Sequence, residues 1–330
     1  MSELTPELHD VVMIGAGPSA LTAAVYTTRE DIDTVLIEKG VIGGLAAITD
    51  WVDNYPGYSK GIEGLKLAGE LQAQAERFGA DIRFGEVTRL EDKGDYKLVE
   101  TTEGPIHAKA VLIATGSDYK KIGVPGEAEY YGRGVHYCAT CDGAFYRDKK
   151  LVVVGGGNSA VQEAMFLTRF TTHIDLLVRS ELRASDILQH ELQKLVDEGK
   201  ITVHLNTTTD EIIADENGVN KVVGTKDGQK VDFETDGVFV FVGLKPNTEF
   251  LKDSAIELDE VGLIKTDLSL MTSMSGVFAS GDVRSGATAQ IASAVGEGAT
   301  AALKIREYIE GHQDMLSHAA GSAEHPVLTV

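Results

Sequence analysis

Near its start, the chain alternates short apolar runs with a glycine-rich turn and a longer helical stretch. Val11–Ile14 is an apolar, partly β-branched run, the pattern of a buried parallel strand. Leu21–Arg29 is expected to be a helix, and a second apolar run, Thr34–Ile37, ends at Glu38. The order strand, turn, helix, strand predicts a βαβ unit.

The turn of this unit, Gly15–Ala20, has the spacing G-x-G-x-x-A. In such a turn the first glycine permits the sharp bend, and the second lets the backbone approach a pyrophosphate. A small third residue lets helix and strand pack closely, and the helix N-terminus faces the anion. Glu38 is placed to accept hydrogen bonds from ribose hydroxyls. The pattern predicts a dinucleotide site; the alternative is a turn that only packs an α/β layer.

The same arrangement recurs in the middle of the chain. Leu151–Val154 is the predicted strand, Gly155–Ala160 the turn, Val161–Phe170 the helix and Ile174–Val178 the second strand. One G-x-G-x-x-G-like turn is weak evidence in a glycine-rich chain, but two in register between strand and helix are strong evidence. Two dinucleotide units are therefore predicted.

The two units differ at the end of their second strand. The first ends in the carboxylate of Glu38, whereas the second ends at Val178 and continues with Arg179 and then Arg183. A carboxylate suits an unphosphorylated ribose, and arginines suit the 2′-phosphate of NADP. The first unit is therefore expected to hold FAD and the second NADPH. The alternative for both arginines is an ordinary solvated surface.

Length and composition indicate a two-domain globular protein. The chain has 330 residues, of which 43% are hydrophobic and 25% charged. No apolar run reaches the roughly 18 residues of a membrane span, and the N-terminus lacks the pattern of a signal peptide. A cytosolic location and no membrane partner are expected. The net charge of -21 repels phosphate backbones, so no nucleic-acid partner is expected.

The chain has only two cysteines, Cys138 and Cys141. A secreted disulfide scaffold uses more cysteines. A zinc site needs four ligands, and His136 would supply only a third. No metal is therefore expected, and zinc is kept as the alternative. A C-x-x-C pair beside βαβ units is more typical of a redox dithiol.

The segment Cys138–Gly143 (CATCDG) resembles the active site of bacterial low-molecular-weight thioredoxin reductases. The resemblance runs from about Asp10 to Glu310. Other matching segments are Gly43-Gly44, Asp53–Gly57, Ala114–Gly116, Gly132–Val135, Val277–Asp282 and Ala289–Ile291.

The resemblance implies an α/β fold with two Rossmann-like dinucleotide-binding domains, the second inserted into the first. The FAD domain would comprise residues 1–118 and 246–330, and the pyridine-nucleotide domain, residues 119–245, would carry the cysteines. The linkers Asp118–Lys120 and Lys245–Asn247 would form a hinge for domain rotation. A homodimer is also implied.

The resemblance and the two turns together define the expected cofactor sites. The residues expected to bind FAD are Gly15, Gly17, Pro18, Ser19, Ala20, Glu38, Lys39, Gly43, Gly44, Leu45, Asn54, Val87, Ala114, Thr115, Gly116, Gly281, Asp282, Ala289, Gln290 and Ile291. The residues expected to bind NADPH are Gly155, Gly157, Asn158, Ser159, Ala160, Arg179, Arg183 and Gly243.

The implied reaction is the reduction of a thioredoxin or thioredoxin-like protein. NADPH would reduce the flavin, and the flavin would reduce the Cys138–Cys141 disulfide. By resemblance Cys141 is the flavin-proximal sulfur, Cys138 attacks the substrate disulfide, and Asp142 supplies or relays the proton. The alternative for Asp142 is a helix N-cap.

Several positions depart from the family pattern. The loop Val178–Ser180 replaces a His-Arg-Arg end, and Leu45 and Ala289 replace a glutamine and an arginine. Ala144-Phe145 stands where two phenylalanines help to seat thioredoxin. Relatives without the arginine motif include enzymes that use ferredoxin or another donor, so ferredoxin is an alternative donor. A third alternative is a redox sensor or zinc-binding module.

The tail 312–330 is small and polar, extends beyond what the fold needs, and is expected to be mobile. A role in covering a neighbouring subunit's nucleotide site is an open possibility for it.

Overall fold

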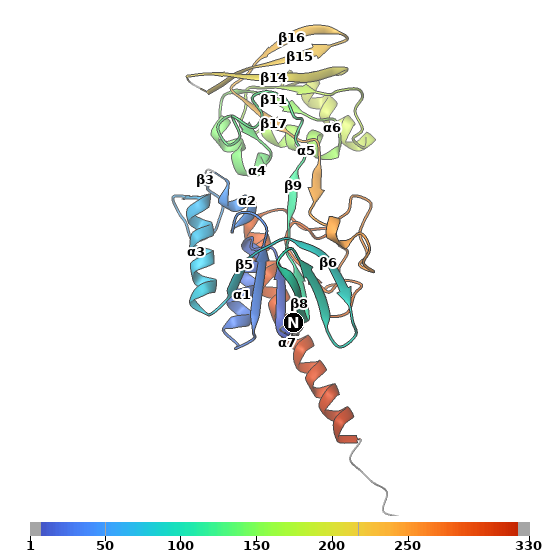
Figure 1. The fold of residues 1–330 in the computed structure, drawn as a ribbon. Helices are drawn as coiled ribbons and strands as arrows, with labels where there is room; N and C mark the ends of the chain where they lie inside the picture. The colour runs from blue at the N-terminus through green and yellow to red at the C-terminus, as the bar shows by residue number, and fades with distance from the viewer. Residues whose placement is uncertain (1–7, 50, 217, 323–330) are drawn as a thin grey trace, which may run out of the picture. The chain divides into compact units, whose positions relative to one another are not determined.

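The computed structural model describes residues 8–49, 51–216 and 218–322. The chain forms two compact units, Met1–Asp118 with Pro246–Val330, and Tyr119–Lys245 (Figure 1). It passes from the first unit to the second within β9 (Ser117–Tyr119) and returns within β18 (Leu244–Pro246).

The first unit is built on a mixed sheet in the order β5-β2-β1-β8-β7-β6. The pairings β5–β2, β2–β1 and β1–β8 are parallel, and β19 also pairs in parallel with the carboxyl half of β8. The pairings β8–β7 and β7–β6 are antiparallel. The strands are β1 (Leu8–Ile14), β2 (Thr34–Glu38), β5 (Asp81–Phe84), β6 (Val87–Asp92), β7 (Lys97–Thr101), β8 (Gly104–Ile113) and β19 (Val277–Ala279).

Both faces of this sheet are covered, which explains why the carboxyl halves of its central strands, Val11–Ile14 and Ala110–Ile113, are continuous apolar runs. Val11 and Met13 of β1 face one core with the helices, whereas Val12 and Ile14 face a second core with the segment around Leu251. The remaining elements are α1 (Pro18–Thr28), α2 (Gly44–Ala47), β3 (Trp51–Val52), β4 (Ile62–Glu63), α3 (Gly64–Arg77), η2 (Glu249–Leu251) and α7 (Ile291–Ser322).

The second unit contains a parallel sheet in the order β10-β17-β11-β12-β13 and an antiparallel sheet in the order β14-β15-β16. Its strands are β10 (Val135–His136), β11 (Lys150–Val154), β12 (His173–Leu177), β13 (Ile201–His204), β14 (Thr207–Asp215), β15 (Gly218–Lys226), β16 (Gln229–Glu234) and β17 (Gly237–Val240). Its helices are α4 (Ala139–Asp142), η1 (Gly143–Tyr146), α5 (Asn158–Leu167) and α6 (Asp186–Asp197).

The predicted fold class is confirmed, because each unit carries a βαβ arrangement on a parallel sheet. Helix starts differ from the prediction. α1 begins at Pro18, since proline is favoured in the first helical turn, where its missing N–H costs nothing. α5 begins at Asn158 and ends at Leu167, and β12 ends before Val178.

The C-terminal helix reaches into the tail 312–330, whose mobility stays a prediction. α7 continues to Ser322 (Figure 1), because no proline interrupts the chain before Pro326. Helical structure therefore extends into that tail, and residues 323–330 lie outside the described residues.

α7 approaches α1 so closely that Gly298 has no room for a side chain. A Cβ at this position would lie 2.2 Å from the carbonyl oxygen of Ser19, whereas one at Gly296, also in α7, would meet nothing within 4 Å. Ser19 belongs to the first glycine turn, so this helix contact supports that turn.

We predict that Gly298→Ala destabilises the protein by about 1–3 kcal/mol, because the new methyl group pushes α7 away from the backbone of α1. Gly296→Ala is the matched control and should be stabilising by up to about 1 kcal/mol through helix propensity. Thermal unfolding followed by circular dichroism measures both. Equal shifts in the two variants would contradict the close packing.

Candidate active site

In the first glycine turn, the two glycines meet different constraints. Gly15 has a φ of 101°, and a Cβ there would lie 2.6 Å from the Ala114 carbonyl oxygen, so the fold itself requires glycine. Gly17 is the N-cap of α1 with extended backbone and no side-chain capping bond, and a Cβ there would meet nothing within 4 Å. The N-terminus of α1 is therefore left accessible to an anion.

Glu38, at the end of β2, is held by the turn. Its carboxylate accepts hydrogen bonds from the amides of Ala16 and Gly40, both at 2.7 Å. Carboxylate oxygens have several acceptor sites, so these bonds leave capacity for hydroxyl donors. The side chain lines the cavity described next.

A cavity of about 310 Å³ opens beside this turn. The expected flavin-site residues that line it are Gly15, Gly17, Pro18, Ser19, Glu38, Lys39, Gly44, Leu45, Ala114, Thr115, Gly116, Gly281, Asp282, Gln290 and Ile291. Val87 lines a second cavity of about 90 Å³, which shares Gly15, Glu38, Lys39 and Thr115 with the first. These segments are far apart in sequence and meet at the carboxyl edge of the parallel sheet.

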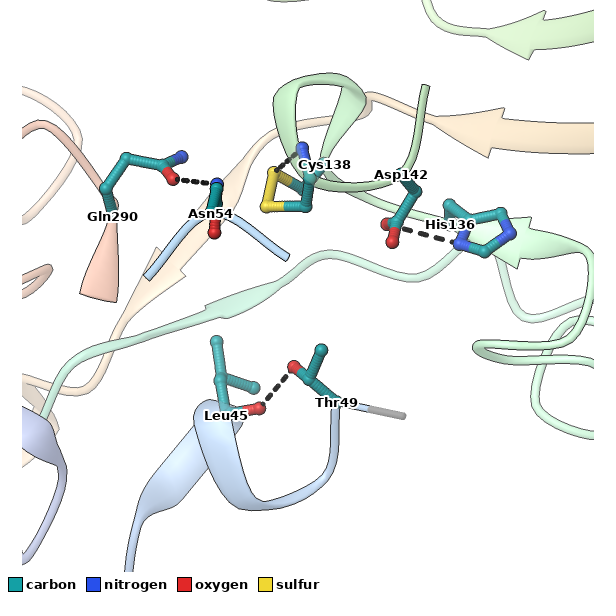
Figure 2. Close-up of a disulfide and its surroundings, with 8 residues drawn as sticks. Leu45, Thr49, Asn54, His136, Cys138, Asp142 and Gln290 are labelled. Atoms are coloured by element: carbon teal, nitrogen blue, oxygen red, sulfur yellow. Dashed lines mark hydrogen bonds and ion pairs between the residues drawn. A yellow bond between two sulfur atoms is a disulfide. The ribbon is translucent and has the colours of Figure 1, made fainter. Parts of the chain in front are cut away.

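Four expected flavin-site residues do not line these cavities. Ala20 is fully buried in the helix-side core. Gly43 has a φ of 99°, and a Cβ there would lie 2.3 Å from the Cβ of Ala68, so packing requires glycine at this position. Asn54 donates a hydrogen bond to Gln290 at 3.1 Å (Figure 2). Ala289 has a positive φ of 54° next to Gln290.

The cavity also contains residues that sequence reasoning missed. The hydroxyl of Ser280 lies 2.6 Å from that of Ser19, and its position directly before Gly281 was a usable signal. Asn247 exchanges hydrogen bonds with Thr115 at 2.8 and 3.1 Å. No local pattern pointed to Asn247, because its partner is 132 residues away.

Asp282 gives the best indication of what this cavity accepts. Its Oδ1 atom is buried and has no hydrogen-bond partner within the described part of the chain. Burial and the neighbouring Glu297 carboxylate raise the pKa of Asp282. An unpartnered buried acceptor at a cavity wall calls for a donor from a ligand. Together with the open helix N-terminus, which suits a pyrophosphate, the residues present fit FAD with its ribityl hydroxyls.

Glu297 fixes the backbone beside Asp282. Its Oε2 accepts hydrogen bonds from the Gly281 amide at 2.8 Å and from Arg284 Nε at 3.1 Å. Its Oε1 lies 2.5 Å from an Arg284 guanidinium nitrogen. This paired carboxylate and guanidinium hold the turn that carries Asp282.

The second glycine turn repeats the geometry of the first. Gly155 has a φ of 144°, and a Cβ there would lie 2.4 Å from the Phe241 carbonyl oxygen. Gly157 is the N-cap of α5, has no side-chain capping bond, and would place a Cβ where nothing lies within 4 Å. The same division holds: one glycine is required by the fold, and one leaves a helix N-terminus open.

A cavity of about 690 Å³ lies beside this second turn. Every residue expected to bind the second nucleotide lines it, namely Gly155, Gly157, Asn158, Ser159, Ala160, Arg179, Arg183 and Gly243. Lys120, Lys121 and Glu181 also line it and were not predicted. The lining therefore carries four cationic side chains and one carboxylate from these positions, a balance that favours an anionic ligand.

The two cysteines form a disulfide at the start of the short helix α4, which follows β10 (Figure 2). Cys138 is the N-cap of α4, and its sulfur accepts a hydrogen bond from the Cys141 amide at 3.2 Å. Asp142 follows directly, and one of its carboxylate oxygens lies 3.2 Å from Nδ1 of His136. Asp142 occupies the N-cap position of η1, but its side chain makes no capping hydrogen bond there.

His136 is not oriented as a zinc ligand. Its Nε2 lies 2.7 Å from the hydroxyl of Tyr146, and Nδ1 faces Asp142. Within residues 8–49, 51–216 and 218–322, no group of three or more His, Cys, Asp or Glu side chains is arranged to hold a metal ion. In the same ranges, no helix is long and apolar enough to cross a membrane.

Comparison with known proteins agrees with this site. The family model for pyridine nucleotide-disulphide oxidoreductases matches residues 9–298. A thioredoxin reductase of Bacillus subtilis (strain 168) is 42% identical over 313 residues, covering 94% of this chain and 98% of that protein. One of Listeria monocytogenes is 41% identical over 317 residues, covering 95% and 98%.

Solved structures give the same result. The thioredoxin reductase from Streptococcus pyogenes MGAS5005 is 41% identical and has a TM-score of 0.88, with coverage of 93% of this chain and 100% of that one. The thioredoxin reductase from Giardia duodenalis is 31% identical with a TM-score of 0.87, covering 92% and 99%.

The chain therefore belongs to the pyridine nucleotide-disulphide oxidoreductase family. Within it, the chain belongs with the low-molecular-weight thioredoxin reductases, which are FAD-dependent oxidoreductases with a redox-active disulfide, here Cys138–Cys141.

We predict that Gly17→Val gives a folded protein that does not retain FAD. The new side chain meets no protein atom, but it would occupy the space that a pyrophosphate needs at the helix N-terminus. Absorbance at 450 nm per polypeptide after purification measures flavin content, and circular dichroism verifies folding. Gly69→Ala, another glycine with open space around it, is the control and should keep its flavin. Wild-type flavin content in Gly17→Val would remove this turn from the site.

Proposed function

We propose that this chain reduces the disulfide of a thioredoxin or thioredoxin-like protein with electrons from NADPH, by way of FAD and the Cys138–Cys141 pair. The observation that carries the proposal is the redox disulfide in the same compact unit as a cation-lined cavity beside a dinucleotide-type turn. The names of the related proteins support the substrate class. By the same resemblance, the functional assembly is proposed to be a homodimer.

The first cavity is proposed to hold FAD. Gly17 and the N-terminus of α1 would face its pyrophosphate, and Glu38 would accept hydrogen bonds from its ribose hydroxyls. Asp282 would accept a hydrogen bond from its ribityl chain. When bound, FAD accepts a hydride from a nicotinamide and passes two electrons on to a disulfide.

The second cavity is proposed to hold NADPH. Gly157 and the N-terminus of α5 would face its pyrophosphate, and Arg179 and Arg183 would bind its 2′-phosphate. Lys120 and Lys121 add positive charge to the same lining. These contacts would hold and orient the nucleotide.

The cysteines and Asp142 are proposed to perform the exchange with the protein substrate. The Cys138 thiolate attacks one sulfur of the substrate disulfide; the substrate S–S bond breaks, its other sulfur leaves as a thiolate, and a mixed disulfide forms. Cys141 then displaces the substrate sulfur from Cys138, which restores the Cys138–Cys141 bond. Asp142, adjacent to Cys141 in the chain, would relay the proton that this exchange moves.

We predict that replacing both Arg179 and Arg183 with alanine raises the KM for NADPH at least about tenfold and changes the KM for NADH little. The reason is that each charge-assisted bond to the 2′-phosphate contributes about 1.5–3 kcal/mol. Raising ionic strength should weaken NADPH use by the wild type more than by the double variant. Steady-state reduction of thioredoxin measures both effects.

Arg169→Ala is the matched control, because Arg169 stacks on Phe166 in the same unit and does not line the cavity. It should leave both KM values unchanged. A double variant whose KM rises equally for NADPH and NADH would contradict the assignment of the arginines. Flavin reduction by reduced ferredoxin but by neither nucleotide would overturn NADPH as donor.

A further inference from the structure

His136 is held rigidly two residues before the redox disulfide. It ends β10, pairs in parallel register with Phe239 of β17, and is 6% exposed. Its ring stacks on that of Phe239 with centroids 5.1 Å apart and meets the Tyr146 ring edge-on at 5.4 Å. Packing of this kind fixes the orientation of the imidazole ring, and with it the direction in which each ring nitrogen points.

Both nitrogens of this imidazole have partners. Nδ1 lies 3.2 Å from the Asp142 carboxylate (Figure 2), and Nε2 lies 2.7 Å from the Tyr146 hydroxyl. A tyrosine hydroxyl can donate or accept a hydrogen bond. The geometry therefore suits a neutral imidazole that accepts a hydrogen bond from Tyr146 at Nε2 and holds Nδ1 at ion-pair distance from the Asp142 carboxylate. It equally suits the state with one more proton, in which Nε2 donates to Tyr146.

The tyrosines packed around His136 and Asp142 keep their own protons, so they do not compete in the proton exchange proposed below. Burial, Asp142 and Asp236 raise the pKa of Tyr146, which therefore stays protonated. Lys149 lies 5.7 Å from the Tyr146 ring, and Tyr131 faces Asp142. Burial and Asp142 raise the pKa of Tyr131 as well, and Phe239 is apolar.

We propose that His136 is a positioning residue that shares one proton with Asp142 and thereby lets Asp142 exchange that proton with the dithiol. The proposal rests on the proposed function, because it assumes that Asp142 relays the proton of thiol–disulfide exchange. The proposal adds His136 as the residue through which the Asp142 carboxylate acts, and Tyr146 is the last group in this series of polar contacts.

When two electrons enter the Cys138–Cys141 disulfide, the S–S bond breaks, one sulfur takes the shared proton, and the other is left as a thiolate. When the dithiol reduces a substrate disulfide, the Cys138–Cys141 bond forms again and the thiol proton returns to His136 and Asp142. The substrate sulfurs leave as thiolates and take protons from solvent.

The experiment uses His136→Asn, in which the side-chain amide keeps an N–H donor at the place of Nδ1 and does not titrate. The enzyme is reduced with dithiothreitol, desalted without oxygen, and mixed with excess 5,5′-dithiobis(2-nitrobenzoate). The rate of thionitrobenzoate release is measured from pH 5 to 9. This reaction uses neither NADPH nor thioredoxin, so its outcome does not depend on either being the physiological partner.

We expect part of the pH dependence of the wild-type rate to come from the His136–Asp142 pair, and His136→Asn to lose that part. At pH 7 the variant should be slower by roughly tenfold or more. Asp142→Asn should behave alike, and the double variant should be within about twofold of Asp142→Asn, because residues that act through one another are not additive.

His204→Asn is the matched control. It removes a second histidine–carboxylate contact of the same unit, 2.8 Å from His204 Nε2 to Asp175 Oδ1, and should keep the wild-type profile. If His136→Asn does not retain flavin, His136→Gln, which can still reach Tyr146, replaces it. A uniform loss of rate with an unchanged pH profile, or effects of the two variants that multiply, would overturn the proposal.

Discussion

At Gly15 and again at Gly155, the chain leaves a buried parallel strand with a positive φ and turns directly into a helix. A Cβ at either position would lie within 2.6 Å of a carbonyl oxygen, that of Ala114 or of Phe241. The glycine therefore brings strand, helix and the neighbouring strand end together more closely than any other residue allows. The helix N-terminus then opens onto a cavity, and the space beyond Gly17 and Gly157 is left for a ligand.

The redox chemistry depends on a second, smaller arrangement in the Tyr119–Lys245 unit. β10 is only two residues long, yet its pairing with β17 buries His136 against Phe239. The chain then forms α4, which carries the disulfide and places Asp142 beside that imidazole. The aromatic packing around His136 thus fixes the imidazole that lies next to Asp142.

Local patterns were sufficient for the βαβ units and for the fold class. Every residue expected to bind the second nucleotide lines one cavity, because the turn, the following strand end and Gly243 lie at one edge of a parallel sheet. The contribution of Asn247 was not predictable, since its partner Thr115 lies far away in sequence. The contact of His136 with Asp142 was missed for another reason: a two-residue strand leaves no periodic signal. Gly43 is assigned to the cofactor from family resemblance, and this stays a prediction; its φ and its closeness to Ala68 require glycine there for packing as well.

We propose that Cys138 and Cys141 receive electrons from FAD bound to the same protein. An anaerobic dithionite titration of the purified flavoprotein tests it most directly, because it counts the electrons accepted per FAD. We expect about four electrons for the wild type, two for FAD and two for the disulfide, and about two for the Cys138→Ser/Cys141→Ser variant. Only two electrons in the wild type, with the same spectra as the double variant, would contradict it.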